Sequence, residues 1–129
     1  MKYKIAVAST DGKVVNEHFG RAETFYIVEG DTEDKEKISL IDIRNVQSFC
    51  EGGRHNDGQF ENVLGKIADC QYVLVSRIGY RAAVELEVRG FRAFELPGII
   101  GESVAELLNY LEVQKLTENI LQERGHGNE

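Results

Sequence analysis

The sequence is short of positive charge, of cysteine and of long apolar runs, and each shortage excludes a class of protein. Only 15 Lys and Arg residues stand against 22 Asp and Glu residues, which gives a formal net charge of −7. Such an acidic chain disfavours generic nucleic-acid binding through a basic surface. No apolar run approaches the ~18 residues of a membrane-spanning helix, and the chain starts without a signal-peptide pattern. We therefore expect a cytoplasmic protein that binds neither nucleic acid nor membrane.

Cysteine is present at two positions, Cys50 and Cys70. In a reducing cytosol, reactivity or metal binding is a more common use of cysteine than a structural disulfide. The chain has no C-x-x-C pair, so the sequence does not support a zinc knuckle. Cys70 follows Asp69 at a predicted helix-to-strand joint, where we expect a packed small hydrophobic residue. Cys50 lies in a glycine-rich loop and is the cysteine available for ligand chemistry.

The apolar pattern of the 129 residues predicts a single α/β domain with the element order β-β-β-α-β-α-β-α. The predicted strands are residues 3–9, 25–29, 38–44, 71–76 and 91–96, with a polar hairpin loop over 30–37. The helices are expected to begin near 56–58, at 78–81 and at a Ser103 cap. We expect residues 1–113 to form the domain, and residues 114–129 to extend the last helix before fraying from 124 onward.

This element order predicts a mixed five-stranded sheet with helices on its faces. Two hairpins make the first three strands antiparallel, and the later helical crossovers require parallel strands. The first and third strands then point the same way. The loops after strands one, three, four and five can therefore share one edge of the sheet, which is where ligands bind in open α/β sheets.

The unusual residues of the chain fall in those loops. His18 is a candidate metal ligand or hydrogen-bond donor to an anion, and Cys50 and His55 could ligate iron, zinc or copper. Gly79 begins a helix whose N–H groups could face an anion. Arg21, Arg54 and Arg77 could pair with an anionic group. The plainer alternatives are a surface histidine, a mobile loop whose cysteine has no role, and solvated surface charges.

Two other functions stay open at this point. Asp11, Glu17 and Glu29 could hold a divalent ion for phosphoryl transfer, although in so acidic a chain they are more simply surface carboxylates. A regulatory interaction module that uses its tail is the third hypothesis. The sequence contains no P-loop or dinucleotide fingerprint, and no nucleophile–histidine pattern of a hydrolase.

Several of these segments resemble the dinitrogenase iron–molybdenum cofactor biosynthesis family, which includes NifX-like proteins, the core of NafY and the C-terminal domain of many NifB proteins. The most specific match is Glu17-His18-Phe19-Gly20-Arg21-Ala22. The resemblance covers residues 3–112, and its other matches are Lys4-Ile5-Ala6-Val7-Ala8-Ser9, Asp11-Gly12, Phe25-Tyr26-Ile27-Val28, Ile78-Gly79, Ala82-Ala83, the helix end from Leu86 to Gly90, and Glu106-Leu107-Leu108.

The resemblance implies a three-layer, ribonuclease-H-like α/β/α fold with a mixed five-stranded sheet. It also implies non-catalytic binding of an iron–sulfur cluster or an iron–molybdenum cofactor precursor, in a family with many small stand-alone members in anaerobes. His18 corresponds to the cluster contact, and Cys50 and His55 lie in a loop where some members have Cys or His beside glycines. We therefore expect a carrier with metal ligands His18, Cys50 and His55, and with Arg21 and Arg54 offsetting the cluster's charge. It would exchange its cluster with donor and acceptor proteins as a monomer or weak dimer.

Overall fold

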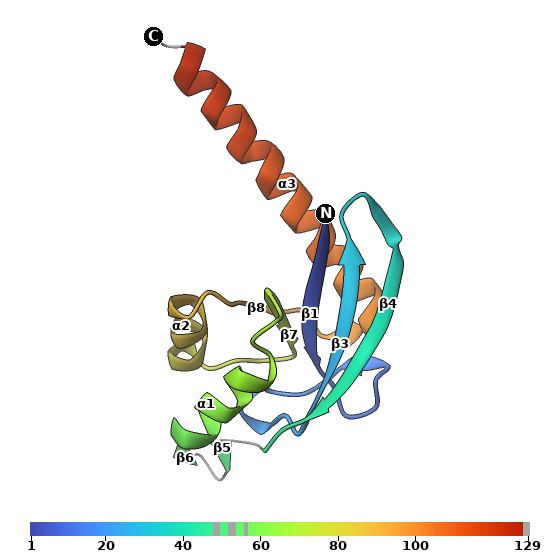
Figure 1. Cartoon of the computed structure of the whole chain (residues 1–129), viewed down its shortest axis with the longest axis vertical. Helices are drawn as coiled ribbons and strands as arrows, with labels where there is room; N and C mark the ends of the chain where they lie inside the picture. Colours follow the sequence, from blue (N-terminus) through green and yellow to red (C-terminus); the bar gives the residue numbers. More distant parts are fainter. Residues whose placement is uncertain (48–49, 52–53, 56, 128–129) are drawn as a thin grey trace.

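A mixed five-stranded sheet forms the centre of the molecule (Figure 1). The computed structural model describes residues 1–47, 50–51, 54–55 and 57–127, and within these it describes no side chain over 50–57 or beyond 123. The predicted element order and mixed sheet are confirmed: β3 pairs antiparallel with both β1 and β4, while β7 and β8 run parallel to β1. In the order across the sheet, the strands are β4 (Asp34–Asn45), β3 (Thr24–Asp31), β1 (Lys2–Ala8), β7 (Tyr72–Val75) and β8 (Arg92–Glu95).

Two layers of helix cover the two faces of this sheet. Because successive strand residues point to opposite faces, β1 sends Ile5 and Val7 to one face and Ala6 and Ala8 to the other. The first face packs against α3 (Ile100–Gly127) through Val104, Leu107, Leu108 and Leu111. The second packs against α1 (Asp57–Lys66) and α2 (Tyr80–Val88) through Phe60, Val63, Leu64 and Leu86. The helical stripes predicted from the sequence are therefore the faces that form the core.

Two short strand pairs and a 3₁₀ turn lie beside the central sheet. β2 (Val14–Val15) pairs with β9 (Gly98–Ile99), and β5 (Cys50–Glu51) pairs with β6 (Arg54–His55). A 3₁₀ turn, η1 (Phe19–Arg21), follows β2. These elements were not predicted, because two-residue strands carry no periodic signal.

The predicted loop over 30–37 is wrong, since β3 runs to Asp31 and β4 begins at Asp34. The Asp31 carboxylate closes the short turn by accepting hydrogen bonds from the Glu33 N–H at 2.9 Å and the N-terminal amine at 3.1 Å. The charged residues of this stretch lie in the edge strand β4, where one side is solvated and a polar sequence is tolerated.

The predicted start and end of the last helix also need correction. α3 begins at Ile100, whose N–H donates to the Lys13 carbonyl at 3.0 Å, so Ser103 lies one turn inside the helix and is buried instead of capping it. The tail expected to fray from residue 124 is helical through Gly127. In Figure 1 the second half of α3 projects well beyond the sheet. Among the described helices, none is long and apolar enough to cross a membrane.

Candidate functional site

The loop after β1 is closed by its own side chains. Asp11 Oδ1 accepts hydrogen bonds from the Lys13 and Val14 N–H groups at 2.8 and 3.2 Å, and these bonds hold the pKa of Asp11 below its usual value. Thr10 and Asn16 exchange two further bonds, one from the Thr10 N–H at 2.9 Å and one from the Asn16 amide at 2.8 Å. The loop therefore delivers the chain to His18 along a fixed path.

The loop that follows β7 fixes the backbone on either side of His18. The Ser76 N–H donates to the Glu17 carbonyl at 3.0 Å, and the Phe19 N–H donates to the Arg77 carbonyl at 2.9 Å. His18 and Arg77 are thus partners in a short parallel bridge beyond the end of the main strands. The His18 side chain is exposed and makes no capping bond to η1. The backbone is fixed while the imidazole stays accessible.

Phe19 anchors this segment in the core. Its ring is buried and lies 6.0 Å from the ring of Phe25 and 6.3 Å from that of Phe60. Ala22 at the end of η1 is buried as well. His18 and Arg21, the two polar residues of this segment, are exposed. Burial of Phe19 and Ala22 therefore leaves both polar side chains in contact with solvent.

The glycine-rich loop that contains Cys50 and His55 lies near the His18 segment. Cys50 and His55 are directly opposite each other in the β5–β6 hairpin, and the backbone of β5 lies beside η1. Figure 1 shows this hairpin at the end of the molecule opposite the projecting part of α3. The structure thus brings the backbones of His18, Arg21, Cys50 and His55 into one region. Gly52 and Gly53 of the same glycine-rich loop lie outside the described residues.

The arginines whose side chains are described divide into two groups. Arg44 pairs with Asp42 and Asp69, Arg89 pairs with Glu61, and Arg92 bonds to Gln114 and covers the ring of Phe94. Arg21, Arg77 and Arg81 are exposed, and none of them has an ion pair or hydrogen bond from its guanidinium among the residues whose side chains are described. Arg21 is on η1 just after His18, Arg77 is the bridge partner of His18, and Arg81 is in the first turn of α2.

Gly79 caps α2 at the same edge. Its φ of −67° is open to any residue, and a Cβ added there would meet no atom within 4 Å, so neither backbone conformation nor packing requires glycine. The Glu95 carboxylate accepts a weak bond from the Ile78 N–H at 3.4 Å. The acidic groups on this edge are Glu17, Glu23 and Glu95, and only Glu17 is partly buried.

Two residues of the phosphoryl-transfer hypothesis are far apart. Asp11 follows the carboxyl end of β1, whereas Glu29 is paired with Lys4 near the start of that strand. Glu29 also lies 3.9 Å from the Lys2 amine. Where side chains are described, no three His, Cys, Asp or Glu residues form a group that could hold a metal ion. The acidic cluster which that hypothesis requires is not formed by Asp11 and Glu29.

Arg77 was named from the sequence as a possible partner of an anionic group, but its proximity to His18 was not predicted. That proximity depends on the parallel bridge, which sequence pattern does not reveal. Arg81 lies in the first turn of α2 and was not among the residues named from the sequence as anion partners. A hollow of about 690 Å³ does exist in the molecule, but Met1, Lys35 and Glu112 line it at the far end from His18.

The chain matches a known protein family. A family model described as dinitrogenase iron-molybdenum cofactor matches residues 1–113. The chain belongs to this family. The family resemblance of the sequence is therefore confirmed.

Curated relatives carry the name FeMo cofactor biosynthesis protein NifB. The Frankia alni protein is 32% identical over 106 residues, which are 80% of this chain and 20% of the relative. The Chlorobaculum tepidum protein is 34% identical over 100 residues, which are 78% of this chain and 22% of the relative. The chain therefore spans about a fifth of the length of these relatives.

Solved structures show the same fold. The crystal structure of PH0822 matches with a TM-score of 0.60 at 21% identity, covering 82% of this chain and 89% of that one. A protein from Methanocaldococcus jannaschii matches with a TM-score of 0.56 at 9% identity, covering 84% and 90%. At these identities the likeness concerns the fold alone. The narrower ribonuclease-H-like assignment stays a prediction.

Proposed function

We propose that this domain is a non-catalytic carrier that holds an anionic metal–sulfur cluster, an iron–sulfur cluster or an iron–molybdenum cofactor precursor, at the carboxyl edge of its sheet. The cluster is cargo, received from a donor protein and passed to an acceptor. The family to which the chain belongs supports a role in cofactor biosynthesis. The names of the NifB relatives support the same role.

The proposal rests mainly on the structural surroundings of His18. Its backbone is fixed by the hydrogen bonds of Glu17 and Phe19 to the loop after β7, while its imidazole is exposed. A fixed backbone with a free imidazole suits a ligand for exogenous metal, because little conformational freedom of the backbone is lost on binding. Imidazole is a ligand for iron.

Cys50 and His55 complete the proposed ligand set. They are opposite each other in a two-stranded hairpin whose first strand lies beside η1. A thiolate and an imidazole presented from one hairpin suit a soft metal–sulfur surface. In this proposal His18, Cys50 and His55 ligate the cluster, and the chemistry of the cluster itself belongs to the enzymes that make and use it.

Cations around the ligands offset the charge of the cargo. Arg21, Arg77 and Arg81 have no internal partner among the described side chains, and we assign Arg54 on β6 to the same role. Guanidinium groups are suited to anions because they present several N–H donors in a plane. The open space at Gly79 lets an anion approach the start of α2 closely.

Anaerobic reconstitution with iron and sulfide tests this function. We expect wild-type protein to retain iron after desalting and His18→Ala to lose most of it. His126→Ala is the matched control, since it removes a histidine near the far end of α3 and should retain iron as the wild type does. Equal retention by wild type and His18→Ala would exclude the proposed role of His18. Absence of a charge-transfer band in all three proteins would exclude cluster binding.

A further inference from the structure

The distal half of α3 carries an apolar face that nothing in the described chain covers. The exposed fractions of Val113, Leu116 and Ile120 are 61%, 55% and 53%. Such fractions are usual for polar residues on the solvent side of a helix, not for apolar ones. At about 100° per residue, these three positions fall within about 60° of one another on the helix surface. We call them the distal seam.

The distal seam is separate from the face of α3 that packs on the sheet. Val104, Leu107, Leu108 and Leu111 form that buried face. The distal seam is centred about 160° around the helix from them, and it begins where α3 leaves the body of the molecule (Figure 1). It is therefore not a continuation of the core. A helix segment without tertiary packing is marginally stable in water, so an exposed seam of this kind calls for a partner surface.

We propose that the distal seam pairs with the same seam of a second copy of this chain, as a short parallel two-stranded coiled coil. The residue types indicate this occupant. With Val113 and Ile120 at a positions and Leu116 at the d position between them, the seam has β-branched a residues and a leucine d residue, the combination that favours parallel dimers.

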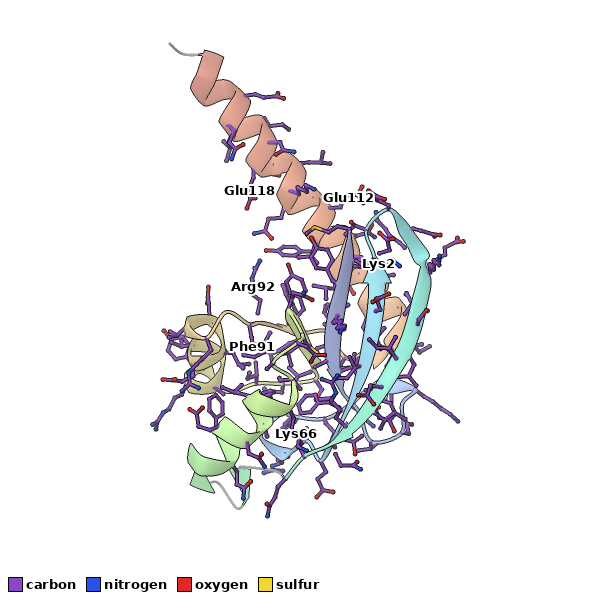
Figure 2. The ribbon with its side chains drawn as sticks, in the orientation of Figure 1. Lys2, Lys66, Phe91, Arg92, Glu112 and Glu118 are labelled. Carbon is purple, nitrogen blue, oxygen red and sulfur yellow. The ribbon has the colours of Figure 1, made fainter. Side chains whose placement is uncertain are left out.

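Charges beside the seam do not oppose self-pairing. In parallel register, Glu112 on one rim faces Thr117 on the opposite rim of the other copy, and no like charges oppose each other there. Arg92 lies on that second rim, held by Gln114 at 3.0 Å and the Tyr110 hydroxyl at 3.4 Å. Figure 2 shows Arg92 extending from β8 toward α3, and it places Glu112 on that helix. Within its own copy, Glu112 pairs with Lys35 of β4 at 2.9 Å.

The seam is bounded at both ends. The preceding a and d positions are Glu106 and Asn109, and the next d position is Glu123, all exposed. The pairing is therefore confined to about two heptads, and we expect a weak dimer that dissociates on dilution. Because α3 projects from the end of the molecule opposite the β5–β6 hairpin, pairing leaves the His18 edge open (Figure 1).

Sedimentation equilibrium across a concentration series tests the pairing. Between about 10 μM and 1 mM we expect the average mass of wild-type protein to rise from 14.5 kDa toward twice that value. Ile120→Glu should remain monomeric. Gln122→Glu adds the same charge on the opposite side of the same helix turn and should behave as the wild type. A wild type that is monomeric throughout, or an Ile120→Glu variant that dimerises equally, would overturn the proposal.

Oxidative cross-linking provides a second measurement that does not depend on a buried charge. In a Cys50→Ser background, Ile120→Cys should form a disulfide-linked dimer on mild oxidation, because parallel pairing places residue 120 of each copy side by side. Gln122→Cys should not. Cys70 is buried and does not interfere. A dimer whose Ile120→Cys variant fails to cross-link would overturn the parallel arrangement.

Discussion

Cys70 and His18 are both metal-ligating residue types, but their surroundings give them opposite accessibility. Cys70 is buried between α1 and β7, and its thiol lies 3.7 Å from the Asp69 carboxylate. Burial, followed by the charge of Asp69, raises the pKa of the Cys70 thiol to about 12. His18 is exposed beside free guanidinium groups. The reactive chemistry of the described chain is therefore concentrated at the sheet edge.

Alkylation of Cys70 checks this assignment. In a Cys50→Ser background at pH 8, we expect iodoacetamide to modify folded protein at least ~100-fold more slowly than urea-unfolded protein, because the thiolate is the reacting form. The raised pKa keeps that form rare below about pH 12. Mass spectrometry over time gives both rates. Similar rates in the folded and unfolded states would contradict a buried, protonated Cys70.

The sequence alone predicted some of the residues of the site. The type and loop position of His18 indicated a ligand, and the position of Cys70 at a predicted helix-to-strand joint indicated packing. Arg77 was named from the sequence only as a possible partner of an anion. Its position beside His18 was not predicted, because it comes from a backbone bridge between segments almost 60 residues apart. Sequence pattern carries local periodicity and does not encode which free loops meet in space.

The loop after β1 contains a position that requires glycine. Gly12 has φ of +74°, a conformation that L residues rarely adopt. A Cβ at this position would lie 2.6 Å from Cε1 of Tyr26 on β3. Glycine is thus required here twice, once by the turn and once by the tyrosine ring beside it. The loop that leads to His18 depends on this residue.

Substituting Gly12 should therefore destabilise the domain. We expect Gly12→Ala to lower the free energy of unfolding by about 1–3 kcal/mol, from backbone strain and the clash with Tyr26. Urea unfolding followed by circular dichroism measures the change. Gly65→Ala in α1, where a Cβ meets no atom within 4 Å, is the matched control and should be neutral or slightly stabilising. A neutral Gly12→Ala would show that this turn has another conformation in solution.

The elements themselves were largely predictable, and the failures have one physical cause. Buried strands and amphipathic helices were found because burial imposes a periodic apolar pattern. The edge strand β4 was truncated at its charged start, since an edge strand needs no apolar residues there. The start of α3 was misplaced at Ser103 because Ile100 is fixed by a distant carbonyl, that of Lys13, which no local cap signals.

Across the whole molecule the net charge is −7, whereas the edge that carries His18 holds both signs of charge. Its exposed guanidinium groups are those of Arg21, Arg77 and Arg81, and its carboxylates are those of Glu17, Glu23 and Glu95. Because these arginines have no internal ion pair among the described side chains, they are available to an anion. Their attraction acts over roughly the ~8–10 Å Debye length of physiological salt. In the proposed carrier, these arginines would offset the charge of an anionic cargo.

Retention of a reconstituted cluster should accordingly depend on salt. We expect retained iron to fall several-fold between about 50 and 500 mM NaCl. The Arg77→Gln, Arg81→Gln double variant should show low retention at both concentrations. Arg89→Gln is the control, because Arg89 pairs with Glu61 and lies outside the site, so its salt dependence should match the wild type. A double variant with unchanged salt dependence would contradict the electrostatic role.

The position of the hydrogen bonds around His18 has a kinetic consequence. The bonds of the adjoining residues Glu17 and Phe19 run back to the loop after β7, and the exposed side of the imidazole faces solvent. In the proposed carrier, an acceptor's own ligands would reach cargo bound there without any strand or helix having to move. Exchange would then proceed by associative substitution, one bond forming as another breaks. The rate of handover would rise with acceptor concentration and remain independent of how tightly the domain is folded.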